Sequence, residues 1–188
     1  EENMHRLILT CGAALLAMSS ALPAHAAEQL LTFTQGDFCN GGKLCTNNAI
    51  IDQNYGSSAG VLVTYLSTYD NLNTGPMYYY ERGFGDLNGV AYANKGSADP
   101  LARGRIILGA REGFEITLKS FDLGCFNNVV NCREASYNVR PGFGEYETDT
   151  VGTDYPGHRT IEFNGGYGDA VDIWFGAGEN VGIDNIRY

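Results

Sequence analysis

Short segments of alternating or continuous apolar residues recur along this chain of 188 residues, with turn-forming residues between them. A period of two places every second side chain on the same face of an extended strand, so each segment is expected to form a β-strand. No segment after residue 26 shows the sustained i, i+3, i+4, i+7 apolar spacing of an amphipathic helix. The expected strands span residues 29–33, 60–66, 89–92, 105–108, 114–121, 136–139, 160–163, 170–175 and 181–188.

Nine short strands without intervening helices favour two packed antiparallel sheets. We therefore expect an all-β fold, a two-sheet antiparallel β-sandwich of jelly-roll type, and periodicity leaves a closed barrel as the alternative. The clearest hairpin is expected over residues 105–121, where Ile116 and Leu118 alternate with polar residues after a turn at residues 111–113. The 25 glycines and 12 tyrosines also favour short strands joined by turns.

The N-terminal residues have the parts of a secretory signal peptide. A short basic start precedes an apolar run over residues 7–22, and Ala24 and Ala26 form the A-x-A pattern that signal peptidase cleaves. We expect the cut after Ala26, so that residues 1–26 are the signal peptide. An acylated Cys11 is the alternative, but the apolar stretch before it is very short. The protein is expected to be secreted and extracellular, with the bacterial periplasm or cell surface as variants.

A single domain is expected over residues 27–188, and residues 1–3 lie upstream of Met4, the expected initiator. This length suits one hydrophobic core, and no change in composition marks a linker. No later apolar run approaches the roughly 20 residues of a transmembrane helix, so no membrane span is expected. The formal net charge of −10 disfavours nucleic acid and anionic membranes as partners.

Four cysteines follow the expected cleavage site: Cys39, Cys45, Cys125 and Cys132. An even number in an exported protein indicates two disulfide bonds. Three pairings are open, and the local pairs Cys39–Cys45 and Cys125–Cys132 are favoured because each closes a short loop. A zinc site is the alternative, but the spacing differs from C-x2-4-C and only one histidine follows residue 26.

Groups that could carry catalysis are few. His158, the one histidine after the expected signal peptide, lies in a loop, and no glycine-rich phosphate loop opens a helix. Carboxylates are plentiful and would permit a polysaccharide hydrolase or lyase, but aspartate is also a common turn residue. We therefore expect no enzymatic activity, with such a hydrolase or lyase as the weakest alternative.

Calcium binding is a better explanation of these carboxylates than catalysis, because calcium takes six to eight oxygen ligands from side chains and carbonyl groups. The candidate ligands of a structural calcium ion are Asp37, Asp70, Asp86 and Asp184. No loop with the spacing of an EF-hand is present, so the pattern is diffuse.

Trp174 is the leading candidate for ligand binding. Within residues 169–175 the alternation sends Asp172 and Trp174 to the face opposite the apolar side chains, where the tryptophan could stack on a sugar. The alternative is that a neighbouring loop covers the ring. The run Tyr78-Tyr79-Tyr80 places rings on both faces of a strand, so Tyr78 and Tyr80 form a second platform or simply pack the sheet.

Several motifs resemble secreted bacterial β-sandwich domains of galactose-binding-like, jelly-roll type, as found in exported proteins with a PEP-CTERM sorting tail. The motifs are the tyrosine run at residues 78–80, and residues 85–92, 113–118, 120–124 and 182–188. The resemblance implies binding of carbohydrate or a cell-surface polymer, and a calcium ion near the first and last strands at Asp37 and Asp184. No Val-Pro-Glu-Pro segment follows Tyr188, so a freely secreted or self-assembling protein is expected.

Two function classes follow. The first is an extracellular, non-catalytic module that binds carbohydrate or a surface polymer. The second is a structural subunit of an extracellular matrix, sheath or filament, in which copies of the chain associate through edge strands or tyrosine-rich faces.

Overall fold

The computed structural model describes residues 28–93, 95, 99, 101–127, 134–141, 147–164 and 168–188. The expected signal peptide and Cys132 lie outside these residues. The described part of the chain is all-β, apart from a single 3-10 turn at Gly178–Asn180 (η2), and its strands form two antiparallel sheets. The expected β-sandwich is confirmed. Within the described part, no helix is both long and apolar enough to cross a membrane.

The first sheet has the order β10-β7-β12-β5-β4, and β1 pairs with β12 beside β5. Its strands are β1 (Leu30–Leu31), β4 (Tyr78–Tyr80), β5 (Val90–Tyr92), β7 (Ser120–Cys125), β10 (His158–Glu162) and β12 (Val181–Arg187).

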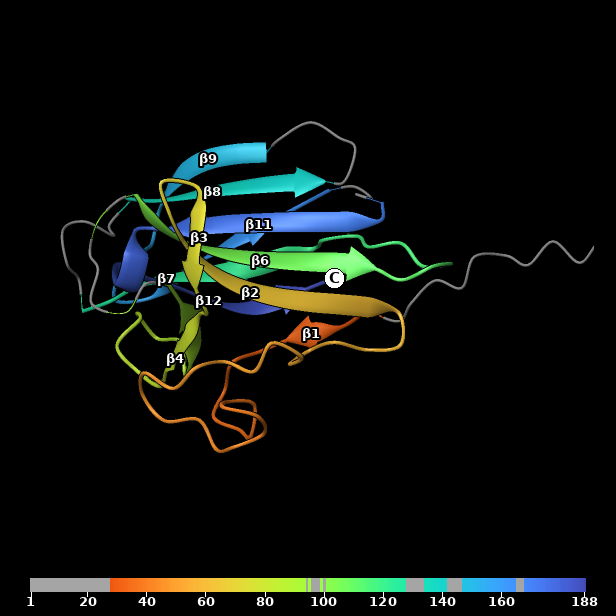
Figure 1. The fold of residues 1–188 in the computed structure, drawn as a ribbon. Helices are drawn as coiled ribbons and strands as arrows, with labels where there is room; N and C mark the ends of the chain where they lie inside the picture. Colours follow the sequence, from red (N-terminus) through yellow and green to blue (C-terminus); the bar gives the residue numbers. More distant parts are fainter. Residues whose placement is uncertain are drawn as a thin grey trace, which may run out of the picture.

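The second sheet has the order β3-β2-β6-β11-β8-β9. Its strands are β2 (Val61–Tyr69), β3 (Leu72–Gly75), β6 (Ala102–Ala110), β8 (Glu134–Pro141), β9 (Glu147–Gly152) and β11 (Ala170–Gly176). In Figure 1, β2, β6, β11 and β8 lie side by side as one layer, with β7 and β12 in the layer behind.

The main core lies between the two sheets, as the period-two patterns predict. Phe121 of β7 meets Tyr137 of β8 edge to face at 5.8 Å, so aromatic rings from opposite sheets interlock. Ile106, Ile173 and Ile183 are fully buried in the same core. Burial of this apolar surface is the main force that holds the sheets together.

The expected hairpin over residues 105–121 is wrong. After β6 the chain leaves the second sheet, and β7 belongs to the first, so β6 pairs with β2 and β11 instead. Ile116 and Leu118 are buried in the connecting segment, where Ile116 forms an isolated bridge with Gly168. The alternation of apolar and polar residues at positions 116–119 therefore comes from a connecting segment that crosses the edge of the core and buries every second side chain there.

A second apolar cluster lies on the outer face of the first sheet. Phe84, Leu87, Val90 and Tyr92 are buried there, while Ala91 between the last two faces the main core. The connection between β4 and β5 covers this part of the sheet. The outer face beside it, over β10, β7 and β12, is polar.

Candidate functional site

Trp174 points away from the main core, as predicted, but its ring is not exposed to solvent. The residue is 5% exposed, and the guanidinium groups of Arg105 and Arg140 lie 4.7 and 5.5 Å from the ring centroid. Arg105 is held there by Asp172, which accepts two hydrogen bonds of 2.9 and 2.8 Å. Trp174 and Asp172 therefore belong to a cation–π and ion-pair cluster on the second sheet, and a sugar could not stack on the ring without displacing an arginine.

The tyrosine run divides between the two apolar clusters. Tyr79 is fully buried in the main core, whereas Tyr78 and Tyr80 pack half-buried against the second cluster. Tyr80 meets the ring of Phe126 at 5.4 Å and Tyr78 meets that of Tyr92 at 5.9 Å. Both rings therefore pack against the second cluster while each residue stays partly exposed.

The four candidate calcium ligands do not come together. Asp37 and Asp70 are exposed in separate loops, Asp86 contacts His158, and Asp184 is buried. Among the residues that the structure describes, no three acidic, histidine or cysteine side chains are grouped as a metal site. A calcium ion at these residues is a prediction that the geometry does not support.

Asp184 instead joins the N-terminal segment to the last strand. One of its oxygens accepts hydrogen bonds from the backbone N–H of Phe33 at 2.7 Å and from the hydroxyl of Thr32 at 3.2 Å. Burial raises the pKa of Asp184 and the charge of Asp122 adds to this, although the hydrogen bonds from Phe33, Asn185 and Thr32 act the other way. The carboxylate is thus a structural acceptor.

Asp122 forms the floor of a hollow on the outer face of the first sheet. Its two oxygens accept hydrogen bonds from Thr160 on β10, at 2.6 Å, and from Asn185 on β12, at 2.8 Å. The hollow has a volume of about 580 Å³, and we call it the polar groove. Its wall carries charges of both signs at Glu28, Lys119, Glu162 and Arg187.

His158 stands beside the polar groove with both ring nitrogens toward carboxylates. Nδ1 lies 2.7 Å from an oxygen of Asp86, and Nε2 lies 3.6 Å from an oxygen of Asp122. Burial lowers the pKa of His158, but the hydrogen bond to Asp86 and the charges of Asp122, Asp86 and Asp184 outweigh it and raise the pKa above its ordinary value. The imidazole thus ties the β4–β5 connection to β10.

A second hollow, of about 490 Å³, lies between the segment after β1 and residues 52–55. We call it the aromatic pocket, because the rings of Phe38 and Tyr55 stack in its wall at 4.3 Å. Its polar lining residues include Thr32, Thr34, Asp37 and Asp52. Asp37 has no hydrogen-bond partner among the described residues, so its carboxylate is available to a ligand.

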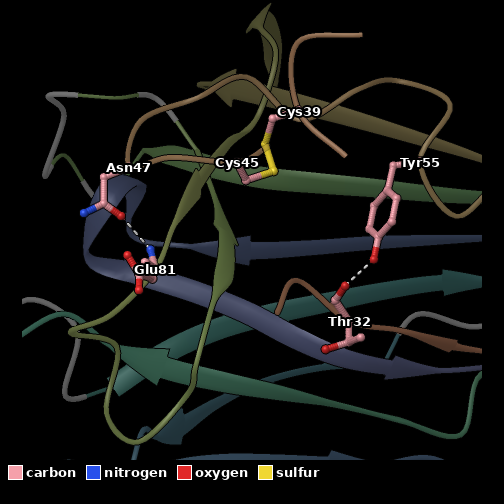
Figure 2. The surroundings of a disulfide bond; sticks show 6 residues. All are labelled: Thr32, Cys39, Cys45, Asn47, Tyr55 and Glu81. Atoms are coloured by element: carbon pink, nitrogen blue, oxygen red, sulfur yellow. Dashed lines mark hydrogen bonds between the residues drawn. A yellow bond between two sulfur atoms is a disulfide. The ribbon is translucent and has the colours of Figure 1, made fainter. Parts of the chain in front are cut away.

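Two local constraints hold the aromatic pocket in shape. The hydroxyl of Tyr55 donates to the backbone carbonyl of Thr32, as Figure 2 shows. The predicted Cys39–Cys45 disulfide is confirmed, and it closes the loop that follows Phe38. Cys125 is also disulfide-bonded, while its predicted partner, Cys132, lies outside the described residues.

Most residues that line these two hollows were not predicted from the sequence as site residues. Asp122 could have been found, because it stands between Phe121 and Leu123 in a strand whose odd positions enter the core. Phe38 and Tyr55 lie in irregular segments, where no periodicity indicates the side on which a ring lies.

No protein-family model matches the chain, and no curated protein matches its sequence. The class that the fold defines is the two-sheet antiparallel β-sandwich.

Proposed function

We propose that this protein is an exported, non-catalytic β-sandwich that binds carbohydrate in the aromatic pocket. The observation that carries the proposal is one hollow of about 490 Å³ that combines the half-buried ring of Tyr55, stacked on the buried ring of Phe38, with the exposed carboxylate of Asp37, which has no partner among the described residues. A sugar presents an apolar C–H face and a rim of hydroxyl groups, which aromatic rings and carboxylates respectively can contact. The hollow's volume lies within the range of ordinary ligand pockets.

The absence of catalysis in this proposal has its own support. The described lining of the aromatic pocket includes no histidine, cysteine or lysine. Of its two carboxylates, Asp52 accepts the backbone N–H of Asn54 at 2.8 Å, and we assign Asp37 to hydrogen bonding with the sugar. His158, elsewhere on the molecule, faces Asp86 and Asp122, so its nitrogens are directed at carboxylates and not at a hydroxyl nucleophile.

Export and the jelly-roll class are parts of the same proposal. The Cys39–Cys45 disulfide supports export, because such bonds persist in oxidising compartments. Strand order supports the jelly roll: β5-β12-β7-β10 lies in one sheet and β6-β11-β8-β9 in the other, so from β5 to β12 the chain alternates between the sheets except at the β8–β9 pair.

The test is a glycan array followed by calorimetric titration with the purified exported protein. Asp37→Asn should weaken binding of any glycan that the array identifies by about tenfold, because a charged hydrogen bond contributes roughly 1.5–3 kcal/mol. Asp70→Asn is the matched control, since Asp70 is also exposed and lies outside the pocket. Binding that both variants retain, or an array without a bound glycan, contradicts the proposal. Release of reducing sugar from a bound glycan would contradict its non-catalytic part.

Self-association is a second candidate function, and it rests on an exposed apolar group at the β2–β3 turn. Leu72 is 72% exposed, and Tyr69 and Leu101 beside it are also exposed. Tyr69 pairs with Leu72 across the turn, and the carbonyl of Leu101 accepts the N–H of Asp70. Light scattering should then show oligomers that Leu72→Lys disperses, whereas a monomer at high concentration excludes this candidate.

A further inference from the structure

The aromatic pocket and the polar groove both include residues of the same N-terminal segment. Glu28 lines the groove, whereas Thr32 and Thr34 line the pocket. Alternate residues of an extended segment share a face, and the residues between them, Leu31 and Phe33, are buried in the main core. One face of this segment therefore contributes to both hollows.

A chain of side-chain contacts joins the two hollows across the first sheet. The hydroxyl of Thr32, in the pocket, donates to Asp184. Asp184 is the cross-strand partner of Asp122 on the groove floor and precedes Asn185, which also lines the groove. Glu28 in the groove and Thr32 in the pocket are four residues apart in the same segment, so along an extended chain the two linings begin roughly 13 Å apart.

The chemistry of the polar groove favours a neutral polyhydroxylated ligand. Ser120, Thr160 and Asn185 supply hydroxyl and amide groups. The three carboxylates of Glu28, Asp122 and Glu162 face the two cations of Lys119 and Arg187, so the lining carries a small net negative charge that disfavours an anionic ligand. The chain as a whole has a formal charge of −10, which disfavours a polyanionic polymer. Phe163, the groove's apolar lining residue, is almost buried, so binding there would depend on hydrogen bonds.

We propose that the polar groove is a second subsite of the same binding surface, and that the ligand is a linear neutral glycan that occupies both hollows at once. This inference rests on the proposed function of the aromatic pocket. A short oligosaccharide would bind in the aromatic pocket alone, and a longer one would add the groove. Because the second contact is then intramolecular, affinity should rise steeply with chain length.

Arg187→Ala tests the second subsite with a matched control. Arg187 lines the polar groove, whereas Arg159 lines neither hollow, and their side chains are similarly exposed at 54% and 51%. The ligands are pairs of two- and six-residue oligosaccharides: cellobiose and cellohexaose, xylobiose and xylohexaose, and maltose and maltohexaose. Calorimetric titration measures each dissociation constant with the full exported protein.

We expect a hexasaccharide to bind the wild type at least tenfold more tightly than its disaccharide. Arg187→Ala should remove most of that gain without changing disaccharide binding, and Arg159→Ala should change neither. Equal affinities for the two oligosaccharide lengths, or an equal loss of affinity with both arginine variants, would overturn the second subsite. The proposed sugar site in the aromatic pocket would still hold in that case if Asp37→Asn weakens binding. If no oligosaccharide of either length binds, the proposed function fails together with the inference.

Discussion

Replacement of Asp184 tests whether this buried carboxylate acts as a structural acceptor. Asp184→Ala removes the acceptor of the Phe33 N–H, and an unpaired buried N–H costs about 1–3 kcal/mol. The Thr32 hydroxyl loses less, because Thr34 Oγ1 lies 3.1 Å away as another partner. We expect a loss of about 2 kcal/mol, which for a chain of this size lowers Tm by roughly 4–8 °C.

Asp184→Asn separates the hydrogen bond from the charge. Asparagine keeps a carbonyl oxygen for the Phe33 N–H, so its cost at neutral pH should be clearly smaller than that of alanine. The raised pKa means that the folded protein holds the Asp184 proton more tightly than the unfolded chain does. As pH falls from 7 toward the ordinary value of 3.8, the wild type should therefore gain stability relative to the asparagine variant.

Urea unfolding of the three proteins between about pH 4 and pH 7 measures both effects. Asp70→Asn is the control for the chemical change, because Asp70 is exposed in a turn and asparagine tolerates its positive φ of 48°. The reasoning is refuted if the asparagine and alanine variants are equally destabilised, or if the wild type loses stability relative to the asparagine variant on acidification.

Three further predictions concern packing, the disulfide and His158. Gly104→Ala should lower the free energy of unfolding by about 1–3 kcal/mol, because an added Cβ would overlap the ring of Phe175. Gly109→Ala on the same strand is the control: the nearest atom to an added Cβ there lies at 4.0 Å, so this variant should lose far less stability. Equal melting temperatures of the two variants would contradict this prediction. Replacing Cys39 and Cys45 together by serine opens a loop of sequence separation 6 and should lower the free energy of unfolding by about 2 kcal/mol, as seen by urea titration. A raised pKa of His158 gives stability that is fully present below the ordinary value of 6.5 and is lost as pH rises through the higher folded-state pKa. The stability gap between wild type and His158→Gln, measured by urea unfolding, should therefore shrink as pH rises above 6.5, and a constant gap would contradict the contact.

The strands that could be predicted are those with a clear local pattern. Residues 170–175 and 181–188 correspond closely to β11 and β12, because Val171, Ile173 and Phe175 show directly which side faces the core. Strands β3 and β9 were missed, since each has a single large apolar residue, Leu72 in β3 and Val151 in β9, and therefore shows no apolar alternation. They lie at the two edges of the second sheet, where pairing with one neighbour is enough to hold them.

The candidate site was less accessible to prediction, because it depends on contacts between distant segments. The face of the sheet predicted for Trp174 was correct, but the ring is covered by Arg105 and Arg140 from the two neighbouring strands. Asp184 looked like a calcium ligand, and its partner is the backbone of Phe33, 151 residues earlier.

Composition and period-two patterning by themselves determined the all-β class and the side on which residues of β11 and β12 lie, and the short spacing favoured the Cys39–Cys45 bond among three possible pairings. Each of these depends on residues close together in the chain. Tertiary structure alone decided that the chain crosses between sheets after β6, that arginines cover Trp174, and that two hollows flank the N-terminal segment. The physical reason is that strand pairing and side-chain cover are set by the burial of apolar surface over the whole domain, which a local period cannot encode.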